Sequence, residues 1–150
     1  MAVKVYKPVT PGLRNMTGYS FEEIEGYLDK QIDISKVSMY TNGALRSFVM
    51  SLKAEGIAIV LLTNNIRSHA EQILKRIGYY DLFDDIFIAF ETGNLKPDLR
   101  CFSNIIAKMG VDPVEAISVG DDFRNDIYPA LVLGIRALHV NGPEDIVPGL

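Results

Sequence analysis

The sequence predicts an α/β protein in which helices cover both faces of a mostly parallel sheet, a three-layer α/β/α sandwich. Short apolar runs alternate along the chain with segments whose apolar residues recur about every 3.6 positions. The run at residues 57–62 (I-A-I-V-L-L) is apolar throughout, which is typical of a strand covered on both faces. Strands that alternate with helices in this way imply parallel strands joined by right-handed crossovers.

The amino-terminal part is predicted to contain a strand, a turn and a helix. Residues 2–6 favour a short strand, and the prolines and glycine of residues 8–12 favour a turn. Ser20, with Glu23 three positions later, has the form of a capping box, which opens a helix. That helix runs to about Lys30 and is polar, so we expect it on the surface.

The rest of the chain is predicted to alternate regularly between helices and strands. A helix begins at Asn42 or Gly43 and ends at Gly56, since glycine commonly follows the last turn of a helix. Strands are expected at residues 57–62, 86–90, 116–119 and 136–140, and helices at residues 68–77, 98–109 and 123–133.

Length and composition indicate an ordinary globular domain. The 150 residues are most simply one domain over residues 1–150. The net charge of −4 gives no reason to expect a nucleic acid or an anionic membrane as a partner. Apolar runs fall short of the roughly 20 residues that span a bilayer, and the amino terminus lacks the apolar core of a secretory signal. The single cysteine, Cys101, excludes an intramolecular disulfide, which fits a cytoplasmic protein. Cys101 falls in a helical pattern and is expected to be buried filler.

Three aspartates follow the predicted strand at residues 116–119. The segment reads V-G-D-D-F-R-N-D and carries Asp121, Asp122 and Asp126. Ligands of open α/β sheets bind at the carboxyl ends of the strands, and clustered carboxylate oxygens suit Mg²⁺. The simpler alternative is that Asp121 or Asp122 only caps the next helix.

Two other segments follow predicted strands at equivalent places. Thr63, Asn64 and Asn65 offer a hydroxyl and backbone N–H groups at the start of a helix, where anions bind readily. Lys96 precedes a proline that restricts its loop, so its ammonium group can hold a phosphate or offset the carboxylates. Each has an ordinary alternative, because threonine and asparagine also cap helices and most surface lysines are only solvated.

Two further features have mainly structural interpretations. An aromatic and apolar cluster over residues 79–87 is expected to be a corner of the core, with a dimer surface, and hence a homo-oligomer, as the alternative. His69 and His139 are not paired with cysteine and do not suggest a zinc site. His69 is expected to face solvent on its helix.

Taken together and in this order, the three segments resemble the motifs of the haloacid dehalogenase-like phosphohydrolase superfamily. L-L-T-N-N is similar to the second motif, L-K-P-D to the third, and V-G-D-D-F-R-N-D-I to the fourth. The resemblance covers residues 40–141. It implies a Rossmann-like sheet, a catalytic pair Lys96 and Thr63, phosphate binding by Thr63, Asn64 and Lys96, and Mg²⁺ held by Asp121, Asp126 and Asp122.

The first motif of that family, D-x-D-x-T, has no counterpart here. The matching turn places Pro8 at the nucleophile and Thr10 at the acid/base, and a shift of one residue places Lys7 and Val9 there instead. No two aspartates stand two positions apart anywhere in the chain. Loss of a covalent nucleophile typically removes about 10⁶ in rate, or ~8 kcal/mol of barrier lowering. The remaining carboxylates are expected to bind Mg²⁺ only weakly.

The resemblance also implies a reduced cap. Residues 12–39 stand where the family inserts a cap domain, and they offer one helix and a turn, so the cap is minimal or absent. The resemblance implies that a member with such an open face acts on a macromolecular or bulky phosphorylated substrate. The partner expected here is a phosphorylated small molecule or a protein.

Three hypotheses remain open from the sequence. We favour a non-catalytic or severely impaired member of the fold that retains phosphate and Mg²⁺ binding. The alternative is an active Mg²⁺-dependent phosphatase that uses an unrecognised nucleophile. The third is an altered amino terminus from which the true first strand is missing.

Overall fold

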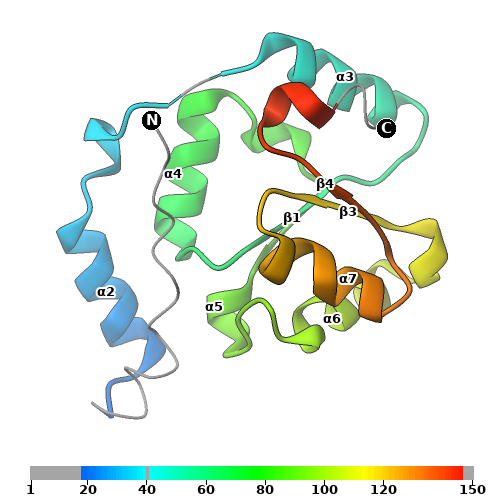
Figure 1. Cartoon of the computed structure of the whole chain (residues 1–150). Helices are drawn as coiled ribbons and strands as arrows, with labels where there is room; N and C mark the ends of the chain where they lie inside the picture. Colours follow the sequence, from blue (N-terminus) through cyan, green and yellow to red (C-terminus); the bar gives the residue numbers. More distant parts are fainter. Residues whose placement is uncertain (1–17, 40, 147–150) are drawn as a thin grey trace.

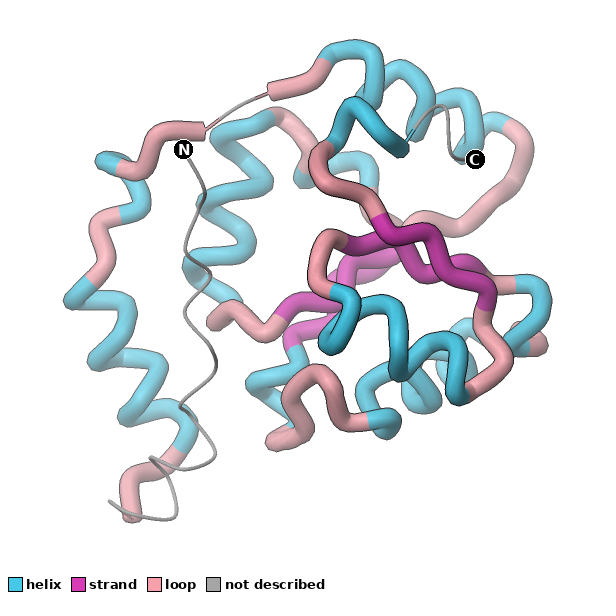
Figure 2. Tube along the Cα trace, viewed as in Figure 1, coloured by secondary structure: helices cyan, strands magenta, loops and turns pink. Residues whose placement is uncertain are grey.

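The computed structural model describes residues 18–39 and 41–146, so the strand and turn predicted at residues 2–6 and 8–12 lie outside the described residues. Figures 1 and 2 show the arrangement of the elements. The helices are α2 (Phe21–Gln31), α3 (Gly43–Ala54), α4 (Arg67–Ile77), α5 (Ala89–Thr92), α6 (Leu99–Met109) and α7 (Tyr128–Val132). The strands are β1 (Val60–Thr63), β2 (Asp85–Ile88), β3 (Ile117–Gly120) and β4 (Arg136–His139).

The strands pair in parallel, which confirms the predicted α/β class. Strand β1 pairs with β2, with Val60 opposite Asp85, and β3 pairs with β4, with Ile117 opposite Arg136. Within the described residues these are two sheets of two strands each, rather than one continuous sheet.

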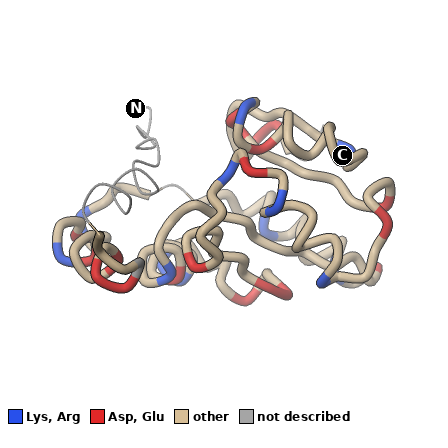
Figure 3. The backbone as a smooth tube through the Cα atoms, turned by 90° about the horizontal axis from the view of Figure 1, so that it is seen from below, with Lys and Arg blue, Asp and Glu red and all other residues tan. Residues whose placement is uncertain are grey.

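Helices lie on both sides of the strands. Helices α6 and α7 contact each other on one side, and α3 lies on the other (Figure 1). Helix α2 lies beside α4, where the Ser68 hydroxyl donates to Asp29 Oδ1 at 2.7 Å. Figure 3 shows basic and acidic residues interleaved along the described chain. In the same residues, every helix is too short or too polar to cross a membrane.

The predicted helix ends are confirmed at several positions. Ser20 Oγ accepts a bond from Glu23 N, while the Glu23 carboxylate accepts one from Ser20 N, which completes the capping box before α2. Asn42 Oδ1 accepts a bond from Leu45 N at the start of α3. Gly78 ends α4 with φ 72°, a left-handed conformation that favours glycine.

Three predicted elements are wrong in extent. The strand expected at residues 86–90 ends at Ile88, because Ala89 and Phe90 begin α5. The strand expected at residues 57–62 begins only at Val60. Just before it, the N–H of Ile59 donates to the Asp84 side chain at 2.7 Å rather than to a strand backbone, while the Ile59 carbonyl accepts from the Asp84 N–H at 2.7 Å. The helix expected at residues 123–133 is divided into a π-helical turn, η4 (Phe123–Ile127), and α7. Pro129 lacks an N–H, and proline is tolerated only in the first turn of a helix. A new helix, α7, therefore begins at the residue before it.

The core cluster of the described residues is built mainly from helix and loop residues, with Ile88 contributed by β2. It includes Phe90 and Ile88, each 2% exposed, and Ala130, which is completely buried. His69 belongs to the buried residues, at 4% exposed, so the expectation that it faces solvent is wrong. Helix α2 covers it, and its Nε2 lies 3.5 Å from Asp29 Oδ1. In the aromatic cluster, the Tyr79 hydroxyl bonds to the backbone of Asn42, as a core corner requires, although Tyr80 is 40% exposed.

The first prediction concerns the carboxylate that holds the entry to β1. The N–H of Ile59 and the ammonium of Lys53 both bond to Asp84, and they hold the pKa of its carboxyl below the usual range. A lowered native pKa means that the carboxylate stabilises the fold above the unfolded value of about 3.9 and stops doing so as the pH falls through the native value. When the pH is lowered below about 4, the melting temperature of the unaltered chain should therefore decrease by more than the melting temperature of Asp84→Asn.

The control is Glu55→Gln, which removes an exposed carboxylate beyond the end of the same helix α3. It should leave the pH profile of the melting temperature unchanged. Identical profiles for the unaltered chain and Asp84→Asn would contradict the role given to Asp84.

Candidate active site

A pocket of about 330 Å³ lies between β1 and β3. Residues Val60 to Leu62 line one wall and Ile117 to Gly120 the other, and apolar side chains of α6 contribute to its lining. Three charged side chains also line it, namely Lys96, Asp121 and Asp126. The structure therefore brings the second, third and fourth predicted segments to one place, the carboxyl ends of parallel strands.

An ion pair between Lys96 and Asp126 is the central contact of this pocket. Lys96 Nζ lies 2.5 Å from Asp126 Oδ1, and the two side chains are only 15% and 13% exposed. The second oxygen, Oδ2, accepts a bond from the N–H of Asp122 at 3.3 Å. A charge removed this far from water is tolerated because its partner and further hydrogen bonds compensate it.

Asn64 holds the backbone of Lys96 in place. Its amide nitrogen donates to the Lys96 carbonyl at 3.1 Å, and its amide oxygen accepts from the Lys96 N–H at 2.8 Å. The side chain that the sequence suggested for phosphate binding is thus used to fix the loop after α5 to the end of β1. Asn64 therefore positions Lys96. The backbone N–H of Asn64 lies at the start of the turn that leads to α4.

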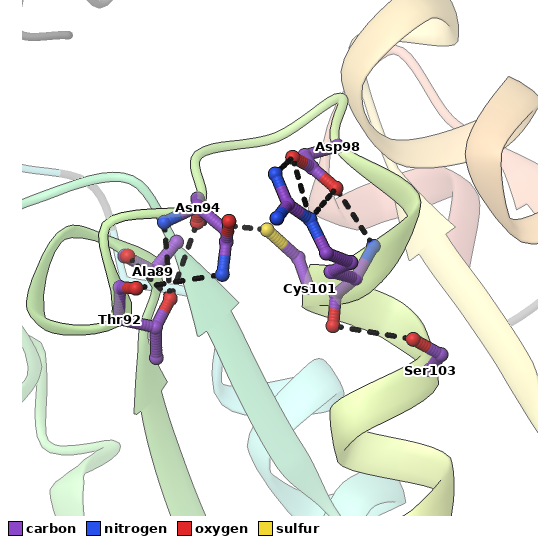
Figure 4. A network of polar contacts seen from close by, with 7 residues as sticks. Ala89, Thr92, Asn94, Asp98, Cys101 and Ser103 are labelled. Carbon is purple, nitrogen blue, oxygen red and sulfur yellow. Dashed lines mark hydrogen bonds and ion pairs between the residues drawn. The ribbon is translucent and has the colours of Figure 1, made fainter.

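Side chains of neighbouring residues hold the loop at residues 93–98, which carries Lys96, through hydrogen bonds (Figure 4). Cys101 Sγ donates to the Asn94 carbonyl at 2.9 Å, and Thr92 Oγ1 accepts from the Asn94 N–H at 3.3 Å. Asp98 caps α6 by accepting from the N–H of Arg100. Cys101 is 5% exposed, as predicted for buried filler, and burial raises the pKa of its thiol to about 11, so it stays protonated.

Thr63 ends β1 in a tight local turn. Its hydroxyl oxygen accepts a bond from the N–H of Asn65 at 3.0 Å, and the residue is half-buried. Thr63 is not among the residues that line the pocket.

Of the three aspartates after β3, Asp122 serves as a cap. Its carboxylate accepts from the N–H groups of Arg124 and Asn125 and from the Asn125 amide. Burial opposes its ionisation, but these hydrogen bonds outweigh burial and lower the pKa of Asp122. The capping alternative weighed from the sequence therefore describes Asp122, and Asp121 and Asp126 are the two that line the pocket.

These residues fit a divalent cation only in part. Asp121 and Asp126 supply the hard oxygens that Mg²⁺ prefers, but one oxygen of Asp126 is already bound to Lys96. The described part of the chain contains no group of three or more acidic, histidine or cysteine side chains arranged to hold a metal ion.

Three supporting residues were not predicted from the sequence. Ser118 Oγ donates to the Asp126 carbonyl at 2.9 Å, and His139 Nε2 bonds to the Asp121 carbonyl at 3.0 Å. Gly120 allows a close approach, since a Cβ there would lie 2.4 Å from Asp126 Cβ. Of these three residues, only Gly120 could have been found from the sequence, because it directly precedes the aspartates.

Comparison with known proteins gives a family match over most of the chain. The family model described as haloacid dehalogenase-like hydrolase matches residues 8–140. A glyceraldehyde 3-phosphate phosphatase of Methanothermobacter thermautotrophicus is 32% identical over 95 residues, which is 63% of this chain and 42% of that protein. A phosphoserine phosphatase of Thermus thermophilus is 34% identical over 102 residues, 66% of this chain and 41% of that protein. The chain thus spans about two fifths of the length of these relatives.

Solved structures show the same fold. A phosphatase from Thermococcus onnurineus superposes with a TM-score of 0.62 at 26% identity, over 79% of this chain and 53% of that chain. An enzyme from Bacteroides thetaiotaomicron, solved as an aspartate-to-alanine variant with magnesium and inorganic phosphate, superposes with a TM-score of 0.59. Its identity is 22%, and the match covers 87% of this chain and 69% of that one.

The close approach at Gly120 leads to the second prediction. Gly120→Ala forces Asp126 to move, which should cost about 1–3 kcal/mol of unfolding free energy, as overpacking typically does. The matched control is Gly26→Ala in the exposed middle of α2, where a Cβ meets nothing within 4 Å. It should stabilise the chain by roughly 0.5–1 kcal/mol, because alanine is the better helix former. Urea unfolding of both variants measures the difference, and equal stabilities would contradict it.

Proposed function

Since the chain belongs to the haloacid dehalogenase-like hydrolase family, we propose that it binds a phosphorylated small molecule beside Lys96 and hydrolyses it poorly or not at all. We place the phosphate between the Lys96 ammonium, the Thr63 hydroxyl and the N–H groups that follow Thr63. An ammonium group and a helix amino terminus both favour an anion.

One observation carries this proposal: both carboxylates that line the pocket among the described residues come from the segment after β3, Asp121 from the loop and Asp126 from η4. Asp126 is bound to Lys96 and Asp121 is exposed at the edge, so neither stands opposite the lysine as a free nucleophile. Covalent phosphoryl transfer needs an acceptor atom on the far side of the phosphate from the leaving group. We propose that the pocket keeps the groups that hold a phosphate, and none of its described carboxylates is placed as a free nucleophile.

We propose that Mg²⁺ binds weakly, through Asp121 and Asp126. When bound, the ion would neutralise charge on the phosphate oxygens. The affinity would be low because only two carboxylates are available, and because the ion must displace Lys96 from Asp126. The magnesium and phosphate in the aspartate-to-alanine enzyme from Bacteroides thetaiotaomicron support binding without a full set of aspartates on this fold.

We propose that the ligand is small and reaches the pocket without passing a cap domain. Within the insert predicted at residues 12–39, the described residues form α2 and a short 3-10 turn, η1 (Ile34–Lys36). Helix α2 is tied to α4 through Glu25 and Asp29, and none of the described insert residues lines the pocket. We propose that this reduced insert does not act as a cap. The relatives' names, phosphatases of glyceraldehyde 3-phosphate and of phosphoserine, support a small phosphorylated metabolite.

The third prediction tests phosphate binding directly. Titration calorimetry with inorganic phosphate should show saturable binding by the unaltered chain and at least a tenfold loss of affinity in Lys96→Met, because the ammonium is the main cationic contact. Lys36→Met removes a lysine that is 82% exposed and far from the pocket lining, so it should bind like the unaltered chain. Equal affinity in Lys96→Met would overturn the proposed site.

The fourth prediction tests the missing chemistry. With p-nitrophenyl phosphate and Mg²⁺, the unaltered chain should show at most background turnover, since losing a covalent nucleophile costs about 10⁶ in rate. The double variant Pro8→Asp/Thr10→Asp should gain turnover that disappears again when Lys96→Met is added. Magnesium- and Lys96-dependent hydrolysis by the unaltered chain would instead establish an active phosphatase with another nucleophile.

A further inference from the structure

We infer that the outer face of α7, together with the turns beside it, is the contact surface of a symmetric dimer of this chain. Five large apolar side chains on this surface are each 51–68% exposed. They are Phe123 of η4, Tyr128, Leu131 and Val132 of α7, and Val114 of the 3-10 turn η3 (Pro113–Glu115). We call these five residues the α7 patch. It is distinct from residues 79–87, the dimer surface considered from the sequence.

The α7 patch runs from one end of α7 to the other (Figure 1). The turn η4 leads directly into the helix, and Tyr128, Leu131 and Val132 follow the i, i+3, i+4 spacing that brings side chains to one helix face. The turn η3 lies beside the end of α7, because a Cβ added at Gly134 would lie 3.9 Å from Pro113 Cβ. The patch is therefore one surface rather than a set of scattered side chains.

The composition of α7 differs from that of an ordinary surface helix. Residues 127–135 contain no charged residue, and Ala130 on the core side is completely buried. A surface helix normally carries polar side chains on its outer face, whereas α7 is apolar on both faces. Met50 of α3 is also exposed, at 53%, but its helix carries Arg46 and Lys53, and single exposed apolar residues of this kind are common.

Phe123 is held in place although it is 56% exposed. Its ring packs edge-on against His139, with the ring centroids 6.2 Å apart and the planes at 80°. An aromatic side chain that is already held loses little conformational freedom when a partner covers it. Such side chains serve as anchors in protein interfaces. Phe123 therefore suits a contact surface better than a flexible apolar residue would.

The area of the α7 patch fits a dimer of this chain. From their exposed fractions, the five side chains present roughly 400 Å² of apolar surface. A standard interface buries about 800 Å² on each partner, and homodimer interfaces are about 65% apolar. The patch thus supplies most of the apolar part, and polar residues around it supply the remainder. In a two-fold dimer the same patch lies on both sides, so a single contact covers both copies of it.

The lack of charge favours a second copy of this chain over a charged partner. A nucleic acid would need cationic groups that residues 127–135 do not offer. Two copies of α7 can lie antiparallel across a two-fold axis without bringing like charges together there. Each copy then removes the apolar surface of the other from water, which drives association. This contact does not depend on the phosphate binding proposed above.

Sedimentation velocity of the full chain over a concentration series tests the dimer. The unaltered chain should sediment as a dimer at high concentration and dissociate on dilution. Leu131→Asp should raise the dimer dissociation constant by roughly a hundredfold or more, because it places two carboxylates in the apolar contact. Met50→Asp is the matched control, since Met50 is 53% exposed and Leu131 is 52% exposed, and it should sediment like the unaltered chain. Circular dichroism checks that both variants are folded.

Two results of this measurement would overturn the inference. One is an unaltered chain that remains monomeric at every concentration up to the millimolar range. The other is a folded Leu131→Asp variant that dimerises as strongly as the unaltered chain.

Cross-linking keeps the test decisive if Leu131→Asp does not fold. Leu131→Cys is a milder change, and a short bismaleimide should join two copies of it covalently. Met50→Cys is the control and should remain uncross-linked. Cys101 is 5% exposed and its thiol has a pKa of about 11, so it should resist the reagent in both variants. Equal yields of linked dimer from the two variants, or none from Leu131→Cys, would overturn the inference.

Discussion

The contact between Lys96 and Asp126 holds the described structure together at its functional end. The two small sheets share no ladder in the described residues, and this ion pair connects the loop after β2 to the turn after β3. Asn64 adds the third connection, from the end of β1 to the backbone of the same lysine. Because both charges are largely removed from water, breaking the pair by removing one partner is expected to cost about 3–5 kcal/mol. Fold and site therefore depend on the same few atoms.

Much of the local structure could be predicted because its causes are local. Ser20 and Glu23 satisfy each other's N–H groups within one turn, and Gly78 ends α4 through its own backbone freedom. The errors came from distant contacts. The Asp84 side chain accepts from the Ile59 N–H across 25 positions, and α2 covers His69. A pattern within a single segment contains only one partner of such a contact, so it cannot reveal the pair.

The same division applies to the site. Lys96, Asp121 and Asp126 line one pocket, as their places after predicted strands suggested, although α5 separates β2 from the loop that carries Lys96. Their individual roles depended on hydrogen bonds. Asn64 turned out to bind the lysine backbone 32 positions away, and Asp122 to cap the next turn. Family membership explains why these residues occur in this order, and the lack of an acidic first motif explains why binding and cleavage must be considered separately here.

Lys96 already forms an ion pair, and this affects which anions the pocket would prefer. Its ammonium already has a carboxylate partner at 2.5 Å, so any incoming anion acts by substitution rather than by simple addition. A singly charged ion replaces one negative charge by an equal one and gains little. A doubly charged phosphate monoester gains an additional electrostatic contact with the lysine and the nearby N–H groups. Discrimination between ionisation states of the ligand would thus follow from the contact that Lys96 already makes.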